Sequence, residues 1–202
     1  MHYNFIEIGT SDFDTEIQTC ADTDVGISVD PILFYLQRLP AKPHVMRVLA
    51  AISDSDGFVD VYHVPETNIR AYGMPDWVRG CNSIGAHHPT VAHMLQTCGI
   101  DPATVIQKTS VPKFSMTTFL RMYNVSSCDY LKIDTEGHDT VILCNYIEAV
   151  KAGITQPAKR LCFEANSLTP AALVDGTILL LTTELGYMLE TRDDNVVMRL
   201  RD

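Results

Sequence analysis

The feature that most constrains this chain is the regular alternation of short apolar strand patterns with helical patterns. Strand patterns occupy residues 5–9, 25–29, 45–52, 58–64, 130–133 and 160–164, and the tail contains two more, joined at 193–195. Helical patterns occupy 32–39, 90–98, 115–124 and 139–152, and another begins at Thr169 and Pro170 and ends at Gly186. This alternation predicts an α/β fold with an open, doubly wound, mostly parallel sheet, to which the C-terminal hairpin adds an antiparallel strand.

The length and the continuity of the pattern predict a single domain. The chain has 202 residues, with no internal repeat and no linker composition. Within it, residues 65–90 combine three prolines with three glycines and follow neither a strand nor a helix pattern. Long loops in compact domains are often functional, so we expect a substrate lid in this segment.

The composition of the chain indicates its cellular compartment and excludes some classes of partner. No run of about 18 apolar residues is present, and the first residues lack the charged and apolar regions of a signal peptide. The six cysteines form no CxxC pair, which is typical of reduced thiols inside cells. A formal net charge of −10 disfavours nucleic acid, because phosphate backbones would be repelled. We therefore expect a cytoplasmic protein without membrane or nucleic-acid partners, in an oligomeric state that stays open.

Polar and acidic residues follow the ends of the predicted strands. Ligands of open α/β sheets bind beyond the carboxyl ends of the strands, so these residues are the first candidates for a site. The resulting rim is acidic, which is unfavourable for a phosphate group. The residues are Gly9, Thr10, Ser11 and Asp12 after the first strand, Asp30 after the second, Ser53 and Asp54 after the third, Asp134 and Glu136 after YLKI, and Glu164 and Asn166 after RLCF.

The loop GTSDFD after the first strand distinguishes between cofactors. A dinucleotide site uses GxGxxG, whose glycines let backbone amides approach a pyrophosphate, but this loop has one glycine and two acids. S-adenosylmethionine has no phosphate and carries two cationic groups and a ribose diol. Gly9 would allow its close approach, and Asp30 would accept hydrogen bonds from both ribose hydroxyls. The rim therefore favours S-adenosylmethionine over NAD or FAD.

Five stretches of the sequence carry a family resemblance: EIGTSDFDT, SVDP, AISDSDG, YLKIDTEGHD and FEAN. Together they resemble the FkbM-type methyltransferases, S-adenosylmethionine-dependent enzymes with a Rossmann-like fold, from about residue 5 to residue 166. The block KIDTEGHD is the most specific, because the family typically has K-I-D-x-E-G there. The first loop departs from the family pattern D-x-G-A-N-x-G and is interpreted as a subfamily variant. The resemblance implies O-methylation of a hydroxyl group.

The ionisable residues of YLKIDTEGHD are the candidates for catalysis. Asp134 would face the sulfonium and the nucleophile, and Asp134, Glu136 or His138 would remove the proton of the acceptor hydroxyl. Glu136 and His138 can instead stabilise the first turn of the next helix. Lys132 would pair with Asp134 or Glu164, because an unpaired lysine in a central strand is costly. The expected cofactor contacts are Glu7, Gly9, Thr10, Ser11, Asp30, Ser53, Asp54 and Asp134.

The expected lid supplies the candidates for substrate contact. Its histidines, His87 and His88, are less favoured candidates for the general base. The alternative to a lid is a surface loop with Trp77 packed into the core. His87, His88 and His93 lack a specific metal-ligand spacing, so no metal site is expected. The substrate-contact candidates are Trp77, Arg79, Asn82, His87 and His88 from the lid and Glu164 from the rim.

These observations lead us to expect an S-adenosylmethionine-dependent methyltransferase that acts on a hydroxyl of a small molecule or sugar. The methyl group would move in one in-line displacement, so the protein mainly aligns the reactants, which can contribute about 7–11 kcal/mol. Two alternatives stay open. One is a catalytically silent S-adenosylmethionine-binding scaffold. The other is a different Rossmann-like nucleotide-dependent enzyme, against which the missing glycine pattern counts.

Overall fold

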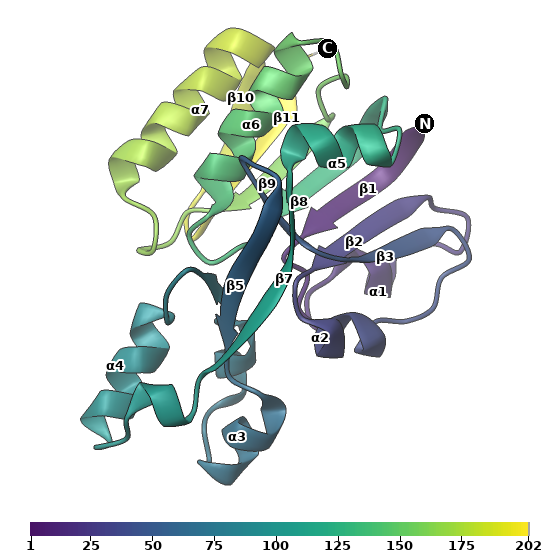
Figure 1. Cartoon of the computed structure of the whole chain (residues 1–202). Coiled ribbons are helices and arrows are strands. Elements are labelled where there is room, and N and C mark those ends of the chain that lie inside the picture. Colours follow the sequence, from purple (N-terminus) through teal and green to yellow (C-terminus); the bar gives the residue numbers. More distant parts are fainter. Residues whose placement is uncertain (202) are drawn as a thin grey trace. The chain divides into compact units, whose positions relative to one another are not determined.

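The computed structural model describes residues 1–201, which form two compact units (Figure 1). Unit 1 contains Met1–Gly57 and the chain from Pro112 onwards, and unit 2 contains Phe58–Val111. Unit 2 is therefore an insertion in the sequence of unit 1. Each unit has a hydrophobic cluster of its own.

Unit 1 is built on a mixed sheet of seven strands in the order β10-β11-β9-β8-β1-β2-β3. The five strands from β9 to β3 run parallel, β11 is antiparallel to β9, and β10 forms an antiparallel hairpin with β11. The α/β class and the C-terminal antiparallel hairpin are thus confirmed. The bounds are β1 His2–Ile8, β2 Gly26–Asp30, β3 Val45–Leu49, β8 Ser127–Ile133, β9 Arg160–Glu164, β10 Tyr187–Arg192 and β11 Asn195–Leu200.

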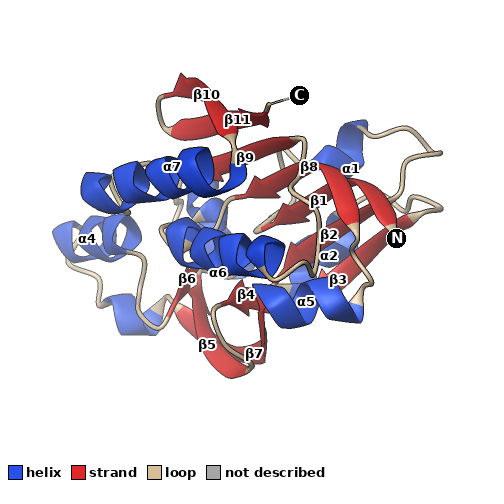
Figure 2. Ribbon diagram, turned by 90° about the horizontal axis from the view of Figure 1, so that it is seen from above, coloured by secondary structure: helices blue, strands red, loops and turns tan. Residues whose placement is uncertain are grey.

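Two separate hydrophobic clusters attach the helices of unit 1 to its sheet. Figure 2 shows these helices and strands as ribbons. Phe5 and Ile6 are consecutive in β1 and belong to different clusters, because successive side chains of a strand point to opposite faces. The cluster of Ile6 includes residues of α5, α6 and α7, and that of Phe5 includes residues of α1 and α2. No helix within residues 1–201 is long and apolar enough to cross a membrane. The bounds are α1 Glu16–Thr19, α2 Leu33–Arg38, α5 Met116–Met122, α6 Asp139–Lys151 and α7 Ala171–Leu185.

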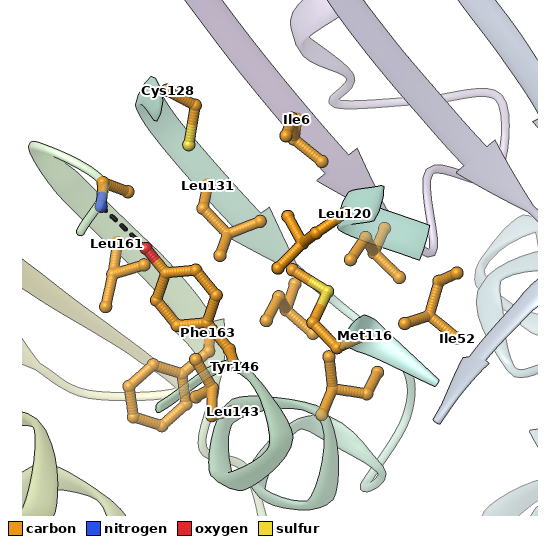
Figure 3. Close-up of a cluster of buried hydrophobic side chains, with 14 of the residues drawn as sticks. Ile6, Ile52, Met116, Leu120, Cys128, Leu131, Leu143, Tyr146, Leu161 and Phe163 are labelled. Atoms are coloured by element: carbon orange, nitrogen blue, oxygen red, sulfur yellow. Dashed lines mark hydrogen bonds between the residues drawn. The ribbon is translucent and has the colours of Figure 1, made fainter. Parts of the chain in front are cut away.

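The larger cluster includes buried side chains of the sheet and of α6 (Figure 3). Tyr146 of α6 is 1% exposed, and its hydroxyl accepts a hydrogen bond from the amide of Ala158 at 2.7 Å. The buried hydroxyl of Tyr187 donates to the carbonyl of the same residue at 2.6 Å. Both tyrosines thus bury their rings without leaving a hydroxyl unpaired, and they fix α6 and β10 against the segment before β9.

Local signals in the sequence set the ends of two helices. The hydroxyl of Ser115 accepts a hydrogen bond from the amide of Thr118 at 3.0 Å, so Ser115 is the N-cap of α5, where the predicted helical pattern of residues 115–124 begins. Gly186 ends α7 with a φ of +79°, a left-handed conformation that glycine adopts without steric cost. Both expectations are confirmed.

The second sheet has four strands in the order β4-β7-β5-β6. β5 and β6 pair antiparallel within unit 2, and β4 pairs parallel with the last residues of β7 within unit 1. The buried core of unit 2 includes Val64, Val78 and Leu95. The bounds are β4 Ala51–Ser53, β5 Gly57–His63, β6 Ser83–Ile84, β7 Gln107–Ser115, α3 Glu66–Ala71, η1 Asp76–Gly80, α4 Pro89–Thr97 and η2 Pro102–Thr104, where η denotes a 3-10 helix.

Two expectations about local structure are wrong. The apolar run at residues 45–52 is not one strand, because it divides at Ala50 into β3 of the seven-stranded sheet and β4 of the other sheet. Residues 65–90 are not an irregular loop either. They hold α3, η1 and β6 and contribute Val78 to the core of unit 2. In this segment proline and glycine mark the boundaries of short elements and do not prevent these elements from forming.

Candidate functional site

The strand order of the large sheet reverses between β1 and β8, and the loops after these two strands meet there. Gly9 has a φ of +82°, and a Cβ atom on it would lie 1.7 Å from the carbonyl oxygen of Asp134. The ammonium group of Lys132 donates to the carbonyl oxygen of Asp14 at 2.6 Å. The expected ion pair of Lys132 with Asp134 or Glu164 does not form, because the lysine holds the loop after β1. Ligands of open α/β sheets bind at such reversals.

Glu7, an expected cofactor contact, is 1% exposed and caps α1. One carboxylate oxygen accepts from the amide of Glu16 at 2.6 Å, and the other accepts from the amide of Ile17 at 3.3 Å and from the hydroxyl of Ser28. Burial raises the pKa of Glu7, and the hydrogen bonds partly counteract this effect. Its oxygens are therefore engaged by the backbone amides of α1 and by Ser28.

Asp30 ends β2 and fixes the loop after β1. Its two carboxylate oxygens accept from the amide of Ser11 at 2.8 Å and from the amide of Ile32 at 2.7 Å. Burial raises the pKa of Asp30 to about 7, although both amides act in the opposite direction. Thr10 and Ser11 are 7% exposed, and the hydroxyl of Ser11 has no hydrogen-bond partner among residues 1–201. These three expected cofactor contacts thus lie together, beneath the surface of the rim.

Three carboxyl groups gather at the ends of β8 and β9. Oxygens of Asp134, Glu136 and Glu164 lie within 4.8 Å of one another. Glu136 has a φ of +54°, a conformation that costs about 1–2 kcal/mol in a residue with a side chain. One oxygen of Glu164 accepts from the side-chain amide of Asn166, and the other is buried with no hydrogen-bond partner in the described chain. Such an arrangement is costly unless a proton or a cation neutralises it.

The acids of this cluster hold their protons more tightly than isolated acids do. Burial, followed by repulsion from Asp139, raises the pKa of Asp134 to about 6, although Lys132 acts in the opposite direction. Burial and repulsion from Glu136 and Asp134 raise the pKa of Glu164 to about 9. At pH 7 Glu164 is therefore protonated and Asp134 is mostly ionised. A cation among these groups would lower both pKa values, so the cluster has the electrostatics of a cation site.

Asp139 supports this cluster and was not among the expected site residues. It is fully buried at the start of α6. One oxygen accepts from the amide and the hydroxyl of Thr135, at 3.2 and 2.7 Å, and the other accepts from the amide of Glu164 at 3.0 Å. It thereby ties the loop after β8 to the end of β9. An acid in a first helical turn was visible in the sequence, but the pattern does not reveal that it bridges two strands.

A serine–histidine contact joins β4 to the start of α6. His138 Nε2 lies 2.9 Å from Ser53 Oγ, which also donates to Asp54 Oδ1 at 3.2 Å. When Ser53 donates to Asp54, His138 must donate through Nε2, which leaves Nδ1 as its basic nitrogen. Burial lowers the pKa of His138, so the ring is neutral at pH 7. Its side chain does not cap α6, which was the alternative role in the sequence.

The substrate contacts expected from a lid all belong to unit 2. Trp77 is 47% exposed, so it is not packed into the core, whereas His88 is 4% exposed. The side-chain amide of Asn82 donates to the carbonyl of Arg79 at 3.1 Å, and His87 packs edge-on against a tyrosine ring with 5.1 Å between centroids. These residues belong to a folded unit with its own core.

Comparison of the chain with protein-family models, with curated proteins and with solved structures gives no match. The functional assignment therefore rests on the chemistry of the rim itself.

Proposed function

We propose that unit 1 is a Rossmann-like, doubly wound domain that binds S-adenosylmethionine and directs its methyl group to a hydroxyl of a small molecule or sugar. The order β3-β2-β1-β8-β9 corresponds to the first five positions of the doubly wound order 3-2-1-4-5-6. The separate clusters of α1 with α2 and of α5 with α6 and α7 support helices on both faces. The observation that carries the proposal is the carboxyl cluster of Asp134, Glu136 and Glu164 at the end of β8 and β9.

The residues present fit the chemistry of this cofactor. Its sulfonium and ammonium groups are cations, and the cluster contains acids whose pKa values are raised by burial and by one another. One buried oxygen of Glu164 has no hydrogen-bond partner within residues 1–201, so a donor or a positive charge on the ligand would satisfy it. The first loop lacks the glycines that a pyrophosphate requires. Asp30 already accepts one amide at each oxygen, so a ribose diol would use its remaining lone pairs.

The roles of the residues follow from their positions. When bound, S-adenosylmethionine supplies a methyl group that is already activated for displacement. Asp134 and Glu164 stabilise positive charge at the ends of β8 and β9. His138, neutral at pH 7 and oriented by Ser53, accepts the proton of the acceptor hydroxyl. Lys132 keeps the loop after β1 in place through the carbonyl of Asp14, and thus acts as a positioning residue.

A divalent cation is a second candidate ligand for the same three carboxyl groups. Hard cations such as Mg²⁺ and Ca²⁺ prefer oxygen ligands, and the oxygens of Asp134, Glu136 and Glu164 lie within 4.8 Å of one another. Ionised carboxylates are required for either ligand. The two candidates therefore differ in the ligand that binds, and not in the pH at which it binds.

Calorimetric titration separates these possibilities. The purified protein is titrated with S-adenosylmethionine, S-adenosylhomocysteine, NAD and MgCl₂. We expect micromolar binding of the two S-adenosyl compounds and none of NAD. Binding of Mg²⁺ alone would favour the second candidate, and binding of NAD alone would contradict both. Saturable binding of S-adenosylhomocysteine without methylation of any hydroxyl compound tested would point to a silent scaffold.

The variant Asp134→Asn tests the role of the cluster in turnover. We expect it to abolish methyl transfer and to retain the fold, because asparagine has nearly the same shape but carries no charge. Asp22→Asn is the matched control, since Asp22 is 77% exposed and forms an ion pair with Lys42 at the surface. Normal turnover by Asp134→Asn would contradict the assigned role.

A further inference from the structure

A groove of about 520 Å³ lies between α6 and α7 in unit 1. Its exposed lining surface is mainly apolar, and the apolar side chains include Val141 and Cys144 of α6 and Leu173 and Leu180 of α7. Leu173 is 55% exposed and Leu180 is 40% exposed, so the apolar surface of α7 is open to solvent here. Small-molecule sites are typically about 300–1,000 Å³, mainly apolar, and provided with a few polar groups. The groove has the size and the lining of such a site.

Gly176 keeps the groove open. It lies inside the 15-residue helix α7, where glycine costs about 1 kcal/mol relative to alanine. A Cβ atom at this position would have no atom within 4 Å, so no packing constraint in the chain requires the glycine. Its φ is not in the left-handed range, so no turn requires it either. A large side chain at this position would therefore enter the groove, which Gly176 lines.

The groove contains one exposed acid that forms no ion pair within residues 1–201. Asp54 lines it, and its Oδ1 accepts from the hydroxyls of Ser53 and Ser55 at 3.2 and 2.9 Å. These hydrogen bonds lower the pKa of Asp54, so the group is ionised at neutral pH. The ammonium of Lys113 donates to the hydroxyl of Ser55 at 2.9 Å. It forms no ion pair with Asp54 in the described chain, but its charge also contributes to the lowered pKa of Asp54. The other acid of the groove, Glu148, lies 3.5 Å from the ammonium of Lys151.

We infer that this groove binds a small, mostly apolar molecule that carries an amino group at the end that meets Asp54. The apolar body would cover Leu173, Gly176 and Leu180, and the amino group would donate to the exposed carboxylate of Asp54. The formal net charge of −10 favours a cation and disfavours an anion of the same shape. The inference does not depend on methyl transfer, because it requires only equilibrium binding.

Protection of a thiol measures occupancy of the groove directly. Cys144 is exposed and lines the groove, whereas Cys98 is exposed in unit 2 and serves as the internal control. Alkylation of both by iodoacetamide is followed by mass spectrometry in the presence of 4-phenylbutylamine, 4-phenylbutanol or 4-phenylbutyrate. We expect the amine to slow alkylation of Cys144 but not of Cys98. The alcohol should need about two- to fivefold higher concentration, as expected for loss of one exposed ion pair, and the acid more still.

Two variants of the groove identify where the amine binds. Gly176→Phe fills the groove with a ring and should abolish protection, whereas Gly176→Ala adds one methyl group and should retain it. Both are expected to fold, because the added atoms enter open space in a helix. Asp54→Asn should make the amine and the alcohol equally effective.

Four results would overturn the inference. They are equal protection by the amine in Gly176→Phe, equal protection of Cys98, equal protection by all three compounds, and no protection at the solubility limit of the amine. Slower alkylation of Cys144 at higher protein concentration without any compound would also overturn it, because a second copy would then cover the groove.

Discussion

The carboxyl cluster should make the protein less stable as the pH rises, and Glu164→Gln should remove most of this effect. Burial and the acids around it raise the pKa of Glu164 from 4.5 to about 9. Between these values the unfolded chain releases the proton and the folded protein keeps it. The unfolded state then binds fewer protons, so stability falls as the pH increases from about 4.5 to 9.

The change in the free energy of unfolding follows from the two pKa values of Glu164, about 4.5 in the unfolded chain and about 9 in the folded protein. At about 1.36 kcal/mol per pKa unit, the difference corresponds to at most about 6 kcal/mol. Because the side chain is partly exposed, solvent screening reduces this figure, and we expect about 2 kcal/mol at pH 8. Glu164→Gln should therefore be about 2 kcal/mol more stable than the wild type at pH 8 and nearly equal to it at pH 5. A gain of this size corresponds to about 4–8 °C in Tm for a chain of this length.

Urea unfolding followed by circular dichroism at pH 5 and pH 8 measures this difference. Glu148→Gln is the control, because Glu148 is 70% exposed on α6 and its removal should change stability by less than about 0.5 kcal/mol. A Glu164→Gln protein that is no more stable than the wild type at pH 8 would refute the reasoning. So would an equal gain at both pH values, because protonation would then not be the cause.

Three further substitutions test the contacts that hold the backbone around the carboxyl cluster. Gly9→Ala should prevent folding of unit 1 or lower its free energy of unfolding by more than about 3 kcal/mol, because the added Cβ would collide with the carbonyl of Asp134. A normal unfolding midpoint would contradict this close approach. Glu7→Gln should cost about 2–3 kcal/mol, because an amide group would face the backbone donor of Glu16; an unchanged urea midpoint would contradict the capping role. Lys132→Met should raise the pKa of Asp134, measured by NMR titration, because the lysine lowers it at present; an unchanged value would show that the ammonium does not act on the site.

Much of the fold follows from local patterns in the sequence. The strand that ends at Glu164 and the helix capped by Ser115 were predicted because apolar periodicity and capping residues are local signals. The division of the apolar run at Ala50 into β3 and β4 was not predicted, because hydrophobicity does not show which sheet a strand joins. β7 was missed since its Pro112 and its exposed polar residues are atypical of strands.

The proximity of acids at the ends of the strands was predicted, but the hydrogen bonds around them were not. Because parallel strands end at one edge, the sequence placed Asp134 and Glu164 together, and the structure brings their oxygens close to those of Glu136. The contact of Lys132 with a backbone carbonyl was not predictable, since it depends on the path of a loop 118 residues earlier. The partner of His138 was missed for the same reason.

The central claim is that the rim holds a cation, and the difference between two ligands tests it most directly. S-adenosylmethionine and S-adenosylhomocysteine share their amino acid and nucleoside parts, and only the first has the sulfonium charge. Their affinities are measured by calorimetry between pH 5 and pH 9, together with the protons released. We predict that S-adenosylmethionine gains affinity over S-adenosylhomocysteine as the pH rises, because Asp134 and Glu164, with pKa values of about 6 and about 9, must ionise to meet the charge. Equal pH dependence of the two ligands, or binding of neither, would contradict the account.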